Sequence, residues 1–263
     1  GAMFGIVPKP VWEKAAKADE RNRILLGLNC LLIRTGTHNV LVDTGMGDKH
    51  DARFRDLYAE AHETTVLKDL AKIGLRPEEL DFVVLTHLHF DHAGGCTVRR
   101  GSQLVPTFPN ATVIIQEGMW EEALDPNPRT KGSHFQEDFV PLREAGRVRF
   151  VKGEEEITPG VRVRRTGGHV KNHQVVLVES GGRKAIYWAD LLPTSAHVKP
   201  AWVMGYDLYP AEVATIKQAM VTEAAAGRWV NVFEHDPAVA MAYFTAEEKG
   251  IRVDPIEPSP SWG

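Results

Sequence analysis

The segment Phe82-Val83-Val84-Leu85-Thr86-His87-Leu88-His89-Phe90-Asp91-His92 decides the fold, because an apolar run passes directly into a motif of histidine and aspartate. The apolar run indicates a strand that is covered on both faces. Alternate side chains of an extended chain share a face, so His87 and His89 can point to one position. As the chain turns after them, Asp91 and His92 can point to a second position beside the first. Imidazole and carboxylate groups are the ligands that zinc prefers. The segment therefore predicts two ligands for each of two neighbouring metal ions.

Three further residues of ligand type occupy comparable places in the sequence. Each follows an expected strand: His169 after 161–165, Asp190 after 185–188 and His235 after 229–233. Loops at strand ends gather into sites, and an acid that extends an apolar run is costly without a partner. Each residue is a weak signal alone, but with the first segment they predict one cluster.

The remaining pattern mixes strands with helices. Strands are expected at 4–11 on an edge, at 24–33 and 40–42 as a hairpin, and at 112–116 and 174–178. Helices are expected at 63–73, 117–124 and 211–226, with one more before the proline-rich tail at 254–260. Two packed sheets with helices outside satisfy this order. No linker or internal repeat divides the chain, so a single domain over 1–263 is expected.

Composition excludes several function classes. The formal net charge of −4, with acids and bases interspersed, offers no basic face for nucleic acid. No apolar run approaches the roughly 20 residues that span a membrane. The start, Gly1-Ala2-Met3, lacks the layout of a signal peptide, so the cytoplasm is the default location, although a removed export signal would leave no trace. We therefore expect a small-molecule substrate and neither nucleic acid nor membrane as partner, and apolar residues near the N-terminus leave a homodimer open.

The motifs together resemble a known family. The residues from Thr86 to Gly95, then Gly167-Gly168-His169, Asp190 and His235, resemble the five-part signature of the metallo-β-lactamase superfamily. Val42-Asp43-Thr44-Gly45 is similar to its first motif, and all parts stand in family order. The resemblance implies an α+β fold, a four-layer αββα sandwich with the site at one edge between the sheets.

The resemblance also implies a ligand set for two metal ions. His87, His89 and His169 would bind the first ion, Asp91, His92 and His235 the second, and Asp190 both. Asp43 would orient a ligand from behind. The histidines outside the motifs are expected to be dispensable: His38, His50, His62 and His134.

A pair of divalent ions of this kind would hold a bridging hydroxide that attacks the substrate. Zinc is expected, with cobalt, manganese and iron as alternatives. Asp91 and Asp190 are the expected catalytic residues, because both would stand beside the nucleophile and could move its proton. Apolar residues near the motif loops, such as Trp120 and Trp202, favour a substrate with an apolar portion.

The complete ligand set is similar to that of the N-acyl homoserine lactone lactonases and of methyl parathion hydrolase. This similarity implies hydrolysis of a lactone or related ester, with organophosphate triesters as further substrates. The alternatives are a thioesterase of the glyoxalase II kind, a phosphodiesterase of the same fold, and a non-catalytic metal-binding sensor. The lactonases place a tyrosine shortly after the bridging aspartate, and 190–195 has none, so Tyr206, Tyr209 and His197 are the candidates to assist the substrate oxygen.

Overall fold

The computed structural model describes residues 1–60 and 65–257 of the chain. Its backbone divides into two compact units. Unit 1 consists of Gly1–Asn29 and Glu154–Gly263, and unit 2 of Cys30–Gly153. The single domain over 1–263 stays a prediction. His62, the start of the helix expected at 63–73 and the end of the proline-rich tail lie outside the described residues.

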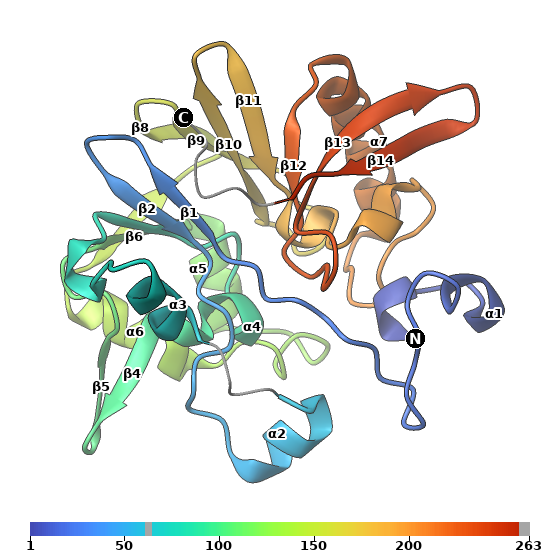
Figure 1. Cartoon of the computed structure of the whole chain (residues 1–263). Coiled ribbons are helices and arrows are strands. Elements are labelled where there is room, and N and C mark those ends of the chain that lie inside the picture. The colour runs from blue at the N-terminus through green and yellow to red at the C-terminus, as the bar shows by residue number, and fades with distance from the viewer. Residues whose placement is uncertain (61–64, 258–263) are drawn as a thin grey trace. The chain divides into compact units, whose positions relative to one another are not determined.

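Unit 2 alternates short strands and helices (Figure 1). In chain order its elements are β1 (Leu31–Arg34), β2 (Asn39–Val42), α2 (Ala52–Tyr58), α3 (Val66–Lys72), η2 (Pro77–Glu79), β3 (Phe82–Val84), α4 (Phe90–Ala93), η3 (Gly94–Cys96), β4 (Thr97–Arg100), β5 (Gln103–Pro106), β6 (Thr112–Gln116), α5 (Glu117–Leu124), α6 (Gln136–Glu144) and β7 (Val148–Val151). The strand at 112–116 and the helix at 117–124 are confirmed. The ribbon of β4 and β5, the helix α6 and the strand β7 were not predicted.

The main sheet of unit 2 has five strands in the order β1-β2-β3-β6-β7. β1 and β2 form the antiparallel hairpin that the sequence predicts, and β2, β3, β6 and β7 run parallel. Parallel strands end at the same edge of a sheet, and Val42 of β2 lies opposite Val84 of β3. Asp43 and Thr86 therefore leave the sheet at one edge.

Unit 1 holds the second sheet. In chain order its elements are η1 (Ala2–Phe4), α1 (Lys9–Trp12), β8 (Glu154–Thr158), β9 (Val161–Arg165), β10 (Gln174–Ser180), β11 (Arg183–Tyr187), η4 (Ala189–Leu191), η5 (Ser195–Val198), α7 (Pro210–Ala226), β12 (Val230–Val232), β13 (Met241–Glu247) and β14 (Gly250–Pro255).

The sheet of unit 1 has seven strands in the order β14-β13-β12-β11-β10-β9-β8. β11 and β12 are parallel, with Tyr187 opposite Val232, and β10 is antiparallel to both β9 and β11. It follows that β9, β11 and β12 all run in one direction. The segments that follow them, which carry His169, Asp190 and His235, leave from the same edge.

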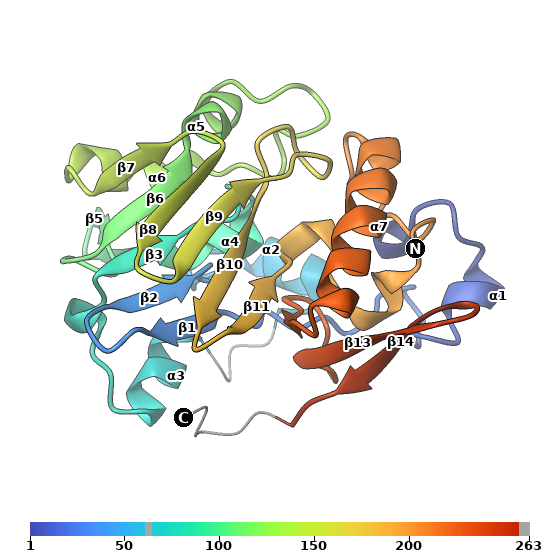
Figure 2. The same ribbon diagram turned by 90° about the horizontal axis from the view of Figure 1, so that it is seen from above.

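Helix α7 covers a face of this sheet and completes the core of unit 1 (Figure 2). Val213, Val221 and Ala224 of the helix pack with Val175 and Ile186 of the strands. All five are at least nine-tenths buried. The helix is therefore held against β10 and β11 by apolar burial.

Two sequence predictions are wrong at the ends of the chain. The edge strand expected at 4–11 is instead η1 followed by α1, because Pro10 stands in the first turn of a helix, where the missing amide hydrogen costs nothing. The helix expected before the tail is instead the hairpin of β13 and β14. Half-buried and buried residues alternate along the start of β13, which is the period of a strand with one face on the core.

The strand expected at 24–33 is shorter than predicted, since only its end forms β1. Within unit 1, the amides of Gly27 and Asn29 instead donate to the carbonyls of His235 and Glu234. This part of the segment therefore supports the loop after β12.

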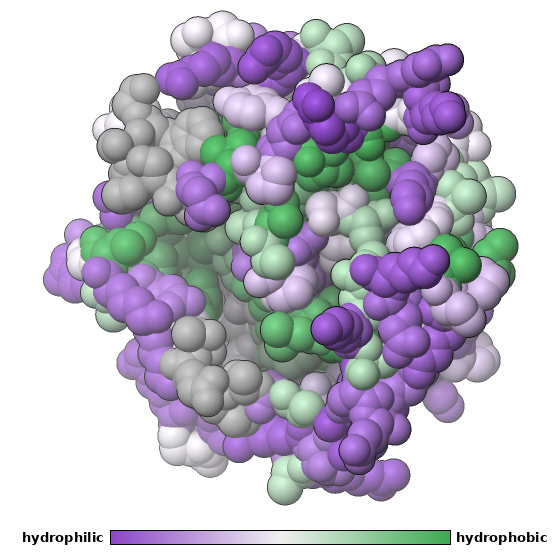
Figure 3. Space-filling view, turned by 45° about the vertical axis from the view of Figure 1, so that its right-hand side comes forward, coloured by the Kyte–Doolittle hydropathy of each residue, from purple (hydrophilic) through white to green (hydrophobic). Residues whose placement is uncertain are grey.

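Among the described residues, no helix is long and apolar enough to cross a membrane. Figure 3 shows one face of the molecule, on which hydrophilic residues surround smaller apolar patches.

Candidate metal centre

Unit 2 gathers four of the predicted ligands at the end of β3. Nε2 of His87 and Nδ1 of His89 lie 2.9 Å apart, close to the roughly 3.3 Å expected for two nitrogens on one tetrahedral ion with bonds of about 2.0 Å. The rings of His87 and His92 lie 3.9 Å apart, and Oδ1 of Asp91 is 3.8 Å from Nε2 of His92. Two neighbouring pairs of donors therefore lie within this unit, as the segment predicts.

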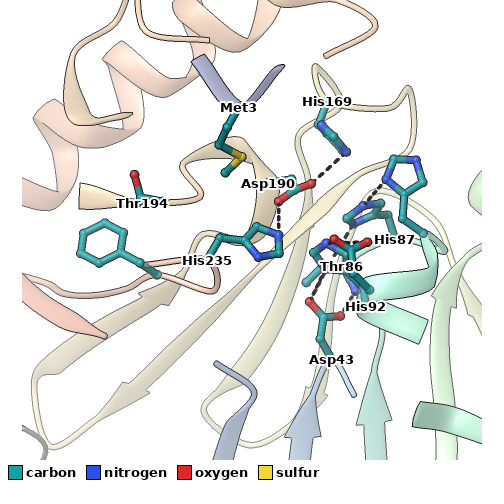
Figure 4. Close-up of polar contacts among 12 residues, drawn as sticks. Met3, Asp43, Thr86, His87, His92, His169, Asp190, Thr194 and His235 are labelled. Carbon is teal, nitrogen blue, oxygen red and sulfur yellow. Dashed lines mark hydrogen bonds and ion pairs between the residues drawn. The ribbon is translucent and has the colours of Figure 1, made fainter. Parts of the chain in front are cut away.

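Asp43 lies behind His92 in the same unit (Figure 4). Its fully buried carboxylate accepts hydrogen bonds from the amide and hydroxyl of Thr86, both at 2.8 Å, and from Nδ1 of His92 at 3.0 Å. Because Nδ1 holds the proton, the lone pair of His92 is on Nε2, where a metal would bind. Asp43 has a φ of 55°, an uncommon backbone conformation for a residue other than glycine. This strain places the carboxylate where it orients His92.

His134 supports the other pair of unit 2. It is buried, its Nδ1 donates to the carbonyl of Leu88 at 2.9 Å, and its ring lies 4.9 Å from that of His89. This hydrogen bond fixes the backbone at Leu88, which stands between His87 and His89 in the sequence. No sequence motif marks His134, and its dispensability stays a prediction.

In unit 1 the carboxylate of Asp190 lies between two imidazoles (Figure 4). Oδ2 is 3.0 Å from Nε2 of His169, and Oδ1 is 3.0 Å from Nε2 of His235. All three side chains are at least nine-tenths buried. A carboxylate that presents one oxygen to each of two imidazoles has the arrangement of a bridging ligand. The donor set and its geometry therefore fit metal ions.

Both imidazoles of unit 1 are held from behind through Nδ1. His169 donates from Nδ1 to Oδ1 of Asp207 at 2.9 Å, and His235 to the carbonyl of Gly27 at 3.0 Å. Burial alone would lower the pKa of His169, but the carboxylates of Asp190 and Asp207 outweigh it and raise this pKa to about 9. Without a bound cation, the imidazole of His169 is therefore protonated on both nitrogens and positively charged at neutral pH. A metal ion could replace this positive charge.

The backbone around His169 explains why two glycines precede it. Gly168 has a φ of 88°, and a Cβ there would lie 2.7 Å from Cγ2 of Val213 on α7. The carbonyls of Gly168 and His169 accept hydrogen bonds from the amides of Tyr209 and Leu208, each at 2.9 Å. The loop that carries His169 is therefore held against the segment that follows Asp207.

Two acids of unit 1 were missed by the sequence analysis. Asp207, which holds His169, also accepts a hydrogen bond from the amide of Met204 at 2.7 Å. Glu234 is fully buried, and a carboxylate oxygen lies within 4.8 Å of ligand atoms of Asp190 and His235. Its place next to His235 was a signal that could have marked it, whereas nothing local marks Asp207.

Asp207→Asn is expected to weaken metal binding about 10- to 100-fold, because the amide carries no charge to favour the required tautomer of His169. Competition with a chromophoric chelator measures the affinity, and Glu223→Gln, which changes an exposed carboxylate of the same unit, is the control. Equal affinity in Asp207→Asn and the wild type would show that Asp207 does not orient a ligand.

The three candidates to assist the substrate oxygen differ in exposure. The side chains of Tyr206 and Tyr209 are 51% and 39% exposed. His197 is fully buried: its Nε2 donates to the carbonyl of Met3 at 2.8 Å, and its Nδ1 pairs with the hydroxyl of Thr194 at 2.7 Å. Both ring nitrogens are thus used within unit 1. His197 is a core residue rather than a donor to a substrate.

The pH dependence of stability tests the role of His197. Burial lowers its pKa to about 4, so as the pH falls from 6.5 the unfolded chain takes up the proton and the folded chain does not. Between pH 7 and pH 5 this group alone is expected to reduce the free energy of unfolding by roughly 2 kcal/mol. His197→Gln should lack this component, which urea unfolding of the metal-free proteins at both pH values measures. An unchanged pH dependence in the variant would contradict a buried neutral histidine.

The chain is similar to known proteins over the part that holds the residues described above. The model of the Metallo-beta-lactamase superfamily matches residues 24–235. The N-acyl homoserine lactonase of Bacillus cereus is 30% identical over 169 residues, which are 60% of this chain and 61% of that protein. The lactonase AttM of Rhizobium radiobacter is 26% identical over 63% of the chain and 61% of its own length. The chain thus covers about three fifths of the length of these curated relatives.

Solved structures share the fold over more of the chain. A protein described as a probable metal-dependent hydrolase from Staphylococcus aureus has a TM-score of 0.90 and 32% identity, covering 98% of this chain and 92% of its own. The dizinc quorum-quenching lactonase AidC has a TM-score of 0.73 at 20% identity, covering 89% and 81%, which shows the fold alone. The predicted α+β fold of the metallo-β-lactamase kind is confirmed.

The family model spans most of the chain, and it includes every motif on which the resemblance was based. Within unit 2 the side chains of His87, His89, Asp91 and His92 lie close together, and within unit 1 those of His169, Asp190 and His235 do. This chain belongs to the metallo-β-lactamase superfamily.

Proposed function

We propose that the chain is a dinuclear metal-dependent hydrolase that opens the ring of a lactone with an activated water. The proposed ligands are the seven residues of the expected set: His87, His89, Asp91, His92, His169, Asp190 and His235. The observation that carries the proposal is the carboxylate of Asp190, which presents one oxygen to His169 and the other to His235. Zinc is the proposed metal, because imidazole and carboxylate suit it and the similar lactonase AidC is described as dizinc.

When bound, such ions supply a water that loses its proton near neutral pH and a positive charge for the acyl oxygen. Asp91 is proposed to accept the proton of the water as its oxygen adds to the acyl carbon. The bond from that carbon to the ring oxygen then breaks, and Asp91 returns the proton to the leaving alcohol. The side chain of Asp91 is 24% exposed, against 7% for Asp190, which favours Asp91 for exchange of a proton with a substrate.

The relatives support a lactone as substrate. The curated relatives are named N-acyl homoserine lactonases, and one similar structure holds N-hexanoyl-L-homoserine as a product. We therefore propose a cyclic ester with an apolar acyl portion, and organophosphate triesters as a further class. Tyr206 and Tyr209 stay the candidates to assist the acyl oxygen. A homodimer and a cytoplasmic location stay predictions, to be tested by mass in solution and by cell fractionation.

A substrate panel tests the proposal. Lactones of increasing acyl length, thioesters, phosphodiesters, phosphotriesters and β-lactams are offered to the metal-replete chain, with its bound metal counted in parallel. We expect the highest kcat/KM on a lactone with an apolar chain and about two zinc ions per chain. Faster turnover of a thioester or phosphodiester would favour those hydrolases instead. Two bound ions without turnover of any compound would support a metal-binding sensor.

A further inference from the structure

We propose that Lys49 and Asp138 of unit 2 form a buried pair that positions the metal-ligating segment around Asp91 and His92. The pair touches neither ligand and acts through the backbone that follows them. This inference rests on the proposed function, since it takes Asp91 and His92 as ligands.

The ammonium group of Lys49 is buried and fully bonded. Its side chain is 1% exposed, and Nζ donates to the carbonyl of Gly94, to the carbonyl of Thr97 at 2.9 Å and to Oδ1 of Asp138 at 3.0 Å. An ammonium has three N–H donors, and these three acceptors account for all of them. A lysine is rarely buried to this degree unless its charge is paired, so the contacts define one position for the side chain.

The two carbonyls tie down the turn that follows the ligands. Helix α4 carries Asp91 and His92 and ends at Ala93, η3 begins at Gly94, and Thr97 is the first residue of β4. Lys49 therefore bridges the two ends of η3. A shift of its ammonium group would move the carbonyl of Gly94, which lies two residues after His92.

The loop before Lys49, which contains Thr44 and Met46, packs tightly against the segment from His92 to Gly94. The amide and the hydroxyl of Thr44 both donate to the carbonyl of His92, each at 2.8 Å. A Cβ on Gly94 would collide with the carbonyl of Met46, so backbone packs directly on backbone. At the end of this loop, Lys49 binds the carbonyl of Gly94. At its beginning, Asp43 orients the ring of His92. The ligand segment is thus held at both ends by one loop.

Asp138 supplies the charge that Lys49 needs. It lies on α6, its side chain is 2% exposed, and Oδ2 has no hydrogen-bond partner among the described residues. Burial raises its pKa to about 6, although Lys49 acts to lower it. The neighbouring residue of α6 also joins the turn, since the carbonyl of Glu137 accepts a hydrogen bond from the hydroxyl of Thr97 at 2.8 Å. Helix α6 is therefore joined to the turn in two ways, by the ion pair of Asp138 with Lys49 and by the hydrogen bond from Thr97 to the backbone of Glu137.

A buried ion pair with only a structural role must be distinguished from one that positions ligands. Replacing both members of such a pair with apolar residues often restores stability, whereas removing one leaves an uncompensated charge. Neither replacement restores donors for the carbonyls of Gly94 and Thr97. Stability and metal affinity should therefore separate in a double variant.

The experiment compares Lys49→Met with Lys49→Met/Asp138→Leu in the full chain at pH 8, well above the pKa of Asp138. The readouts are the Tm of the zinc-free proteins and the zinc affinity by competition with a chromophoric chelator. Lys49→Met is expected to lower the Tm and to weaken zinc binding about 10- to 100-fold. The double variant should regain most of the Tm while its zinc affinity stays at least about 10-fold below that of the wild type.

The control is Lys72→Met, which removes one member of an exposed ion pair with Asp69 in the same unit and should change neither readout. If Lys49→Met alone does not fold, the double variant carries the test. Recovery of zinc affinity together with Tm in the double variant would overturn the inference and leave the proposed function standing. A wild-type chain that binds no zinc would overturn both.

Discussion

Asp190→Asn is expected to lower kcat/KM for the preferred lactone on the order of 10³-fold and to reduce the bound zinc from two ions per chain toward one. Each carboxylate oxygen now lies 3.0 Å from an imidazole nitrogen, one of His169 and one of His235. An amide keeps a single acceptor, carries no negative charge and presents an N–H₂ group to one of the two positions. It can therefore serve one ion at most.

Metal analysis and steady-state kinetics on the same preparation measure both effects. Asp254→Asn, in an exposed ion pair of unit 1, is the matched control and should behave as the wild type. Turnover close to that of the wild type, with two ions retained, would contradict the bridging role of Asp190.

Removal of the metal by a chelator is expected to abolish lactone hydrolysis and to lower the Tm by about 10 °C. Ligand present at about a thousand times its Kd stabilises the folded state by about 4 kcal/mol, and for a chain of this size each kcal/mol shifts the Tm by roughly 2–4 °C. The stabilisation is lost because a chelated cation no longer binds the folded state.

Differential scanning calorimetry with and without chelator, together with the lactone assay, tests this expectation. Addition of zinc in slight excess should restore both activity and Tm, which separates metal loss from irreversible damage. Full activity in the chelated sample would show that hydrolysis needs no bound metal.

Local patterns in the sequence were enough to place most of the strands that carry the site. β6 and β9 have the bounds that the sequence predicts, because each is a short apolar or alternating run between turn residues. His87 to His92 form one motif, and His169, Asp190 and His235 each follow a strand. Within unit 1, His169, Asp190 and His235 follow one edge of the sheet because β9, β11 and β12 run in one direction.

Of the groups that hold the ligands, Asp43 was expected from its motif, but Asp207 and His134 could not be predicted, because they are distant in the sequence from their partners and belong to no pattern. Asp207 bonds to a histidine 38 positions away, and His134 to a carbonyl 46 positions away. Only packing in three dimensions brings such residues together. The N-terminal error has the same cause: the ring of Phe4 stacks on Trp12 at 5.0 Å and on His197 at 5.1 Å, so tertiary contacts decide this segment.

Diffraction from zinc-loaded crystals at the zinc absorption edge tests the central claim most directly. We expect two anomalous peaks about 3.5–4 Å apart, each about 2.0–2.2 Å from the nitrogens and oxygens of its ligands. His87, His89 and His169 should surround one peak, Asp91, His92 and His235 the other, with Asp190 between them. A map from a zinc-loaded sample with no peak at these side chains, or with zinc bound only elsewhere, would contradict the account.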